Sequence, residues 1–218
     1  MGTSGRGDKT IPITAIALNC SLKTSRGGEP SSTDLMIKLV GDALGAHGVA
    51  FTETIRLADH DVLPGVKSNE GEGDAWPDIR DRILSADILI FATPIWLGQL
   101  SSVAKRALER MDAFLSETDP QGRMPSFGKL AVAAIVGNED GAHRVTADLF
   151  QGLNDVGWTI PAGGATYWVG EAMHKTDFKD LPETPKAVTE TIAMLASNAA
   201  HLAGLLAREP YPGVASAP

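Results

Sequence analysis

The sequence predicts an α/β fold in which a doubly wound parallel sheet lies between two layers of helices. Short apolar runs alternate with amphipathic segments along the 218 residues, in the order β-α-β-α-β-α-β-α-β-α. Strict alternation favours a parallel sheet, because each strand needs a crossover helix before the next strand can begin. The length suits one domain of ordinary size.

The predicted strands are short apolar runs bounded by polar loops. Residues 11–18, 87–92 and 130–136 are almost continuously apolar, which is typical of strands buried on both faces. Residues 49–57 alternate between apolar and polar side chains, which predicts a strand nearer the edge of the sheet. A fifth and weaker strand is expected within residues 159–168.

The predicted helices follow from capping residues and from apolar residues at helical spacing. Ser31 and Asp34 stand at capping-box spacing, immediately before the first such pattern. At the last helix we expect Thr184 to be the cap and Pro185 to take the first helical position. Three further helices are expected at 76–85, 101–115 and 143–156.

Composition limits the classes of protein to consider. With 19 basic and 27 acidic residues the net charge is −8, which argues against nucleic-acid binding and against docking on anionic lipid. The single cysteine, Cys20, cannot form an internal disulfide or a cysteine zinc site. Without an apolar span or a signal-peptide core, we expect a cytoplasmic protein. We divide it into an arm (1–10), one domain (11–207) and a tail (208–218).

Ligands of doubly wound sheets bind beyond the carboxyl ends of the strands, so three loops expected at that edge are the candidate ligand-binding segments. The first, residues 19–32, carries hydroxyls and Lys23 and leads into a helix, which favours a phosphomonoester site. It has neither the G-x-G-x-x-G of dinucleotide-binding folds nor a P-loop. The alternative is that its Ser and Thr residues only cap the helix.

The other two loops contain features that suit a flat ring. In residues 93–100, Pro94 fixes the backbone, Gly98 allows close approach, and Trp96 suits a planar ring system. The alternative is that Trp96 packs beneath the following helix. Residues 137–141 can bend tightly and turn N–H groups toward a ligand, or form an ordinary turn with a helix cap. The acidic segment 70–74 is expected to be solvated.

Taken together, these loops resemble those of the NAD(P)H-dependent FMN reductases, a family of flavodoxin-like flavoproteins. Asn19-Cys20-Ser21-Leu22-Lys23, followed by Ser32-Thr33, resembles the phosphate loop of that family. The segment SADILIFATPIWLG at 85–98 resembles its A-D-x-[IV]-[IV]-x-x-[ST]-P-x-[YW]-x-G pattern. The resemblance extends over about residues 11–170. The chain departs from it at Asn19, where the family has a small Gly, and at Lys23, where Arg is common.

The resemblance implies a flavodoxin-like three-layer fold with five parallel strands in the order 2-1-3-4-5. It also implies an FMN site built from the three loops. The FMN phosphate would lie against Ser21, Lys23, Ser31, Ser32 and Thr33. The isoalloxazine ring would lie on Pro94, Ile95, Trp96, Leu97 and Gly98, and Thr93 would also belong to the cofactor site. The third loop would close the other side with Gly137, Asn138, Glu139, Asp140 and Gly141.

The activity that the resemblance implies is hydride transfer from NADH or NADPH, through bound FMN, to a small planar acceptor such as a quinone or a flavin. No catalytic side chain and no metal are implied, since the cofactor supplies the reactivity. Family members are commonly homo-oligomers, so a dimer or tetramer is expected. Two alternatives remain open: a flavodoxin-type electron carrier, and a binding module on the same fold without flavin.

Overall fold

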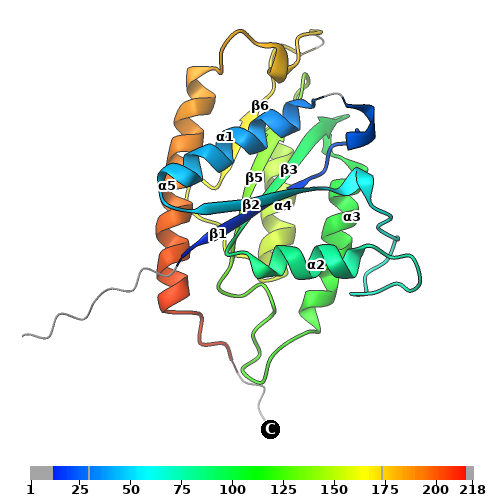
Figure 1. The fold of residues 1–218 in the computed structure, drawn as a ribbon, viewed down its shortest axis with the longest axis vertical. Coiled ribbons are helices and arrows are strands. Elements are labelled where there is room, and N and C mark those ends of the chain that lie inside the picture. The colour runs from blue at the N-terminus through cyan, green and yellow to red at the C-terminus, as the bar shows by residue number, and fades with distance from the viewer. Residues whose placement is uncertain (1–11, 29, 173, 215–218) are drawn as a thin grey trace, which may run out of the picture.

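The computed structural model describes residues 12–28, 30–172 and 174–214, so the predicted arm at 1–10 lies outside the described residues. Five strands form one parallel sheet in the order β2-β1-β3-β5-β6 (Figure 1). They are β1 (Thr14–Asn19), β2 (Ala50–Arg56), β3 (Ile88–Trp96), β5 (Leu130–Val136) and β6 (Ala165–Trp168). Counted along the chain this is 2-1-3-4-5, so the predicted strand order is confirmed.

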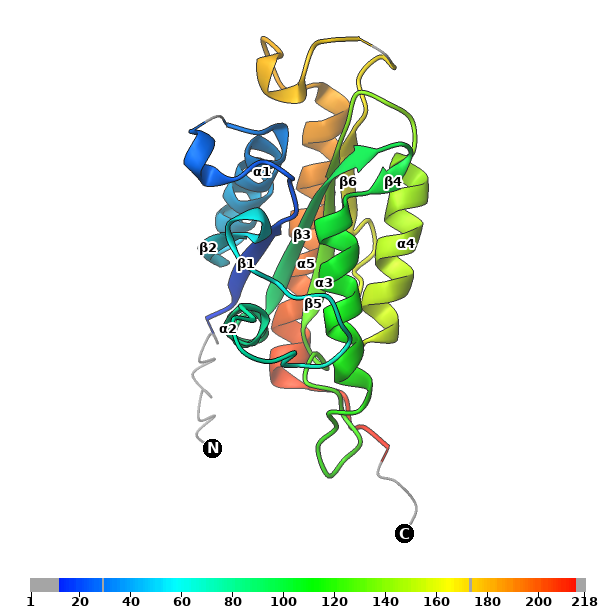
Figure 2. The same ribbon diagram turned by 90° about the vertical axis from the view of Figure 1, so that its right-hand side faces the viewer.

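Helices cover both faces of the sheet (Figures 1 and 2). One face packs against α1 (Ser32–Ala46) and α5 (Lys186–Arg208), and the other packs against α2 (Trp76–Ser85), α3 (Ser102–Met111) and α4 (Ala142–Asp155). Successive residues of β1 enter the two cores alternately, which explains why the central strands are apolar throughout. No helix among the described residues is long and apolar enough to cross a bilayer.

The two helix starts predicted from capping residues differ in outcome. At α1 the capping box is confirmed: the Ser31 hydroxyl accepts the Asp34 N–H at 3.2 Å, and the Asp34 carboxylate accepts the Ser31 N–H at 2.9 Å. At α5 the predicted Thr184 cap is wrong, because the N-cap is Pro185. Pro185 has an extended ψ of 139°, so the helical conformation begins only at Lys186.

The predicted loop at 93–100 is wrong over most of its length. Strand β3 continues to Trp96, turns at Leu97 and Gly98, and returns as the short antiparallel strand β4 (Gln99–Leu100). Both turn residues have positive φ, 53° for Leu97 and 71° for Gly98, as two-residue hairpin loops favour. Pro94 gives a misleading signal, because a residue that cannot donate to a ladder normally marks the end of a central strand.

The predicted solvation of the acidic segment 70–74 is wrong at Asp74. Its carboxylate pairs with Arg110 of α3 at 2.7 Å, and both side chains are 0% exposed. Arg110 also donates to the carbonyls of Leu63 at 2.8 Å and Lys67 at 3.0 Å. A buried guanidinium has to be paired, and here its partners all come from the irregular segment before α2. Arg110 therefore fastens this long segment to the body of the domain.

The protonation of Asp74 follows from these contacts. Burial alone would raise the pKa of its carboxyl, but hydrogen bonds from Arg110 and from backbone N–H groups lower it to about 2. The ordinary value is 3.8. This carboxylate therefore stabilises the fold fully above about pH 4, and the contribution is lost as the pH falls toward about 2.

We predict that Asp74→Asn lowers the free energy of unfolding near neutral pH by about 3 kcal/mol, because it leaves a buried guanidinium without its counter-charge. The variant should also lose part of the dependence of stability on pH between about 4 and about 2. Chemical denaturation across that range measures both effects. Asp42→Asn is the matched control, since its i,i+4 pair with Lys38 is exposed and contributes less than about 1 kcal/mol. Equal losses in the two variants would contradict the assignment.

Candidate functional site

A pocket of about 580 Å³ lies beyond the carboxyl ends of β1, β3, β5 and β6. This volume falls within the range of small-molecule sites, and the position is where doubly wound sheets bind ligands. Most of the residues predicted for the three loops meet here. The lining comprises Ser21, Leu22, Lys23, Ser31, Ser32, Thr33, Pro94, Ile95, Trp96, Leu97, Val136, Gly137, Asn138, Glu139, Trp168, His174 and Asp177.

The amino end of α1 forms one end of the pocket. Ser31, Ser32 and Thr33 stand at its first turn, and Lys23 lies on the loop in front of it. Backbone N–H groups at a helix start have no partner within the helix, and the helix dipole adds positive potential there. The arrangement can therefore bind an anion. The capping of α1 by Ser31 and the lining of the pocket occur together, so the two readings of this loop do not exclude each other.

A network centred on Asp34 fixes the loop in front of α1. The Asn19 amide donates to the Asp34 carboxylate at 2.7 Å, and Arg56 donates to both its oxygens at 2.5 and 2.6 Å. Asn19 also accepts the Ser21 N–H at 2.8 Å, and Arg56 donates to the Lys23 carbonyl at 3.0 Å. Burial would raise the pKa of Asp34, but its hydrogen bonds with Arg56 and Ser31 lower it. Asn19, a departure from the family pattern, thus has a structural role.

The β3–β4 hairpin forms a second wall. The Trp96 side chain lines the pocket and is 54% exposed, so the alternative that it packs beneath the following helix is wrong. The hairpin is joined to the loop after β5 by Glu139, whose carboxylate accepts the N–H groups of Leu97 at 3.0 Å and Gly98 at 3.1 Å. A Cβ on Gly141 would lie only 2.8 Å from the Gly98 Cα, so this close approach requires glycine.

Described residues after β6 contact both the third loop and the start of α1. The Asn138 amide donates to Asp177 at 2.9 Å, and the Lys179 N–H donates to the Ser32 hydroxyl at 3.3 Å. Between these contacts Phe178 is buried against Trp168. None of the three loops contains Trp168, His174 or Asp177. From the sequence, Trp168 at the end of the fifth strand could line the pocket or lie at a subunit contact, and residues 171–181 could serve such a contact or gate the substrate. The structure places Trp168, His174 and Asp177 in the pocket lining.

Four of the residues predicted for the site do not line this pocket: Thr93, Gly98, Asp140 and Gly141. Thr93 is fully buried, and its hydroxyl accepts the Ser101 N–H at 3.2 Å at the start of α3. Gly98 and Gly141 face each other, and Asp140 accepts the Gly141 N–H at 2.7 Å. In this structure these residues shape the two loops rather than the cavity wall.

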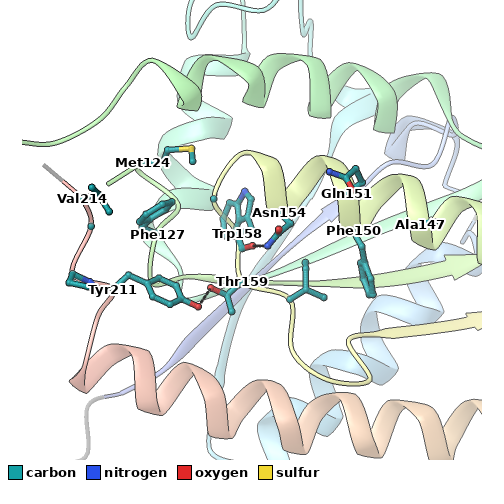
Figure 3. Close-up of a pocket in the computed structure, with 14 residues that line it drawn as sticks. Met124, Phe127, Ala147, Phe150, Gln151, Asn154, Trp158, Thr159, Tyr211 and Val214 are labelled. Atoms are coloured by element: carbon teal, nitrogen blue, oxygen red, sulfur yellow. Dashed lines mark hydrogen bonds between the residues drawn. The ribbon is translucent and has the colours of Figure 1, made fainter. Parts of the chain in front are cut away.

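A second and larger hollow, of about 780 Å³, lies at the opposite edge of the sheet (Figure 3). Its walls come from the end of α4, the loop before β5 and the tail segment 211–214, with Tyr211 and Thr159 joined by a 3.1 Å hydrogen bond. None of the described residues that line it is charged. The described lining of this hollow has no positive side chain that could bind an anion. The smaller pocket at the carboxyl ends of the strands therefore remains the better candidate for the functional site, although its volume is smaller.

Comparison with known proteins identifies the family. A model described as NADPH-dependent FMN reductase matches residues 13–174, which is more than half of the chain. The chain belongs to the NADPH-dependent FMN reductase family. Members of this family bind FMN and use NAD(P)H, so the predicted cofactors are confirmed at the level of the family.

Two curated relatives differ in how much of them the chain covers. An 8-demethyl-8-aminoriboflavin-5'-phosphate synthase of Streptomyces davaonensis is 30% identical over 211 residues, which are 92% of this chain and 81% of that protein. A divalent metal cation transporter, MntH, of Mycobacterium bovis is 37% identical over 164 residues, which are 73% of this chain. The chain spans only 24% of the length of this second relative.

Solved structures confirm the fold. RosB with the bound intermediate 8-demethyl-8-formylriboflavin-5'-phosphate is 28% identical, with a TM-score of 0.81 over 92% of this chain and 82% of that chain. A short-chain flavodoxin matches with a TM-score of 0.54 at 15% identity, over 88% of this chain and 99% of that chain. This second likeness concerns the fold alone, and it agrees with the predicted flavodoxin-like class.

We predict that Arg56→Met raises the pKa of Asp34 toward its ordinary value and lowers the free energy of unfolding by about 2 kcal/mol. The reason is that a half-buried carboxylate loses the guanidinium that pairs with it. Carboxyl NMR titration and chemical denaturation measure the two effects. Arg144→Met, which breaks the exposed helical pair with Asp148, is the control. An unchanged pKa of Asp34 in Arg56→Met would refute the network.

Proposed function

We propose that the pocket at the carboxyl edge binds FMN, with the phosphate at the amino end of α1 and the isoalloxazine ring against the β3–β4 hairpin. On this proposal the chain is an oxidoreductase that passes a hydride from NADPH or NADH, through FMN, to a small planar acceptor such as a quinone or a flavin. One observation carries the proposal: the pocket combines a positive helix end with an exposed aromatic wall.

The phosphate end has the chemistry that a dianion needs. Lys23 supplies a point charge, and Ser32 and Thr33 supply hydroxyls and backbone N–H groups at the helix start. The nearby Asp34 carboxylate would repel a phosphate, but Arg56 neutralises it through two short hydrogen bonds. The network thus preserves the positive potential of the helix end.

The ring end has mainly apolar contacts to offer. Ile95, Trp96 and Trp168 line it, and the half-exposed Trp96 leaves one side open to a nicotinamide or an acceptor. The Leu97 and Gly98 N–H groups already bind Glu139, so recognition of the ring falls mostly on the aromatic and aliphatic faces. The cofactor would supply the redox chemistry, and this chain would bind it, orient it and restrict access to it.

A second candidate function treats the flavin phosphate as substrate. It is favoured by the likeness to RosB, which was solved with a modified riboflavin phosphate bound, and by the likeness to an aminoriboflavin-phosphate synthase. Both functions use the same pocket. For either function we expect a cytoplasmic protein. We also expect a homodimer or tetramer, since Leu97 and Tyr167 leave apolar surface at this edge for a partner to cover.

We predict that Lys23→Ala raises the dissociation constant for FMN about tenfold and leaves that for riboflavin unchanged, because only FMN carries the phosphate. Quenching of flavin fluorescence measures both constants. Lys38→Ala is the matched control: it removes the same charge from α1, but at an exposed position paired with Asp42. Equal weakening of FMN and riboflavin would show that Lys23 does not hold the phosphate.

The two candidate functions predict different products. An oxidoreductase consumes NADPH in proportion to the acceptor reduced, and the mass of the recovered FMN is unchanged. A flavin-modifying enzyme converts FMN to a product of different mass in a reaction not tied to acceptor reduction. Absorbance at the NADPH band, followed by mass spectrometry of the extracted flavin, separates them. We expect the first outcome, and a changed flavin mass would favour the second function.

A further inference from the structure

The hairpin turn at Leu97 and Gly98 holds a carboxylate from a distant part of the chain. Two successive residues with positive φ direct their N–H groups to the same side, which forms a small anion-binding concavity. Glu139 fills it with both oxygens, one at 3.0 Å from the Leu97 nitrogen and the other at 3.1 Å from the Gly98 nitrogen. This two-point contact joins the wall formed by the hairpin to the loop after β5.

The two-residue hairpin favours a positive φ at Leu97, and the contact with Glu139 stabilises this conformation. A left-handed conformation is unfavourable for a branched side chain, and it persists only where the surroundings impose it. The Leu97 side chain is 91% exposed, so packing of that side chain does not impose it. The Glu139 carboxylate instead binds the backbone N–H groups of the turn directly. Gly141 also packs closely against Gly98, so the turn contacts the same loop a second time.

The hairpin turn also sets the position of Trp96. This residue immediately precedes the turn and pairs with Gln99 across the hairpin. Trp96 and Glu139 both line the pocket. We propose that Glu139 is the positioning residue of the flavin-ring wall: by chelating the Leu97 and Gly98 N–H groups it holds the hairpin turn, and with it Trp96, in the shape that receives the ring. This inference rests on the proposed FMN site.

A different role for Glu139 predicts a change in flavin affinity of the opposite sign. If Glu139 were a place-holder that the ring displaces in order to reach the two N–H groups, its removal would free those donors and strengthen flavin binding. A positioning role predicts that removal weakens binding, because the turn loses its shape before the ring arrives. The sign of the change in affinity therefore decides between the two roles.

The first experiment uses the protein without flavin. Hydrogen exchange, followed by NMR, compares the Leu97 and Gly98 amides in the wild-type protein and in Glu139→Ala. We expect both amides to exchange at least about tenfold faster in the variant, while amides of the central strand β5 keep their protection. Glu183→Ala, which removes the same charge from an exposed position before α5, should change neither amide. Unchanged exchange at both amides in Glu139→Ala would overturn the inference.

The second experiment measures binding. Glu139→Ala should weaken FMN and riboflavin by the same factor, about tenfold, because the ring wall serves both ligands. It should also shift the visible spectrum of the bound flavin. Glu139→Gln, which keeps one acceptor oxygen, should be intermediate. This equal loss of affinity for both flavins differs from the effect of Lys23→Ala, which should weaken the binding of FMN alone. Thermal unfolding shows whether the variants remain folded.

The outcomes are distinguishable from failure of the FMN proposal. Tighter or unchanged flavin binding in Glu139→Ala overturns the positioning role and leaves the FMN site in place. Failure of the wild-type protein to bind any flavin overturns the proposed function, and the positioning role with it.

Discussion

The Asp34 carboxylate joins three segments that meet at the carboxyl edge of the sheet. It completes the cap of α1 with Ser31, accepts a hydrogen bond from Asn19 at the end of β1, and pairs with Arg56 at the end of β2. Without Arg56, a negative charge would stand in the first turn of the helix, beside the place proposed for a phosphate. With it, the helix end keeps its positive potential, and the loop that carries Ser21 and Lys23 has a fixed path.

Charge is distributed unequally along the pocket. The α1 end carries Lys23 and the helix dipole, whereas Glu139 and Asp177 supply carboxylates toward the hairpin and the third loop. The proposed ligand, elongated and with one anionic end, would therefore be oriented as well as bound, since reversing it would bring its anion against those carboxylates. The larger hollow at the opposite edge has no charged lining among the described residues and imposes no such orientation.

Local patterns predicted the features that depend on local physics. The apolar runs of β1 and β5, the capping box at Ser31 and the switch-point loops follow from periodicity, hydrogen-bonding capacity and topology. Features that depend on distant partners were not predicted. Asp74 lies in an acidic, glycine-rich segment, and nothing near it in the sequence reveals Arg110 as its partner. Likewise, Asp177 reaches the pocket through contacts of its segment with Asn138, Trp168 and the start of α1, which are all distant in the sequence.

The central claim is that the carboxyl-edge pocket recognises FMN through its phosphate. The most direct test is calorimetric titration of the unmodified protein with FMN and, separately, with riboflavin. We expect one FMN to bind per chain, at least about tenfold more tightly than riboflavin, since only the phosphate of FMN would reach Lys23 and the amino end of α1. Equal affinities for the two flavins, or no saturable binding of FMN, would contradict it.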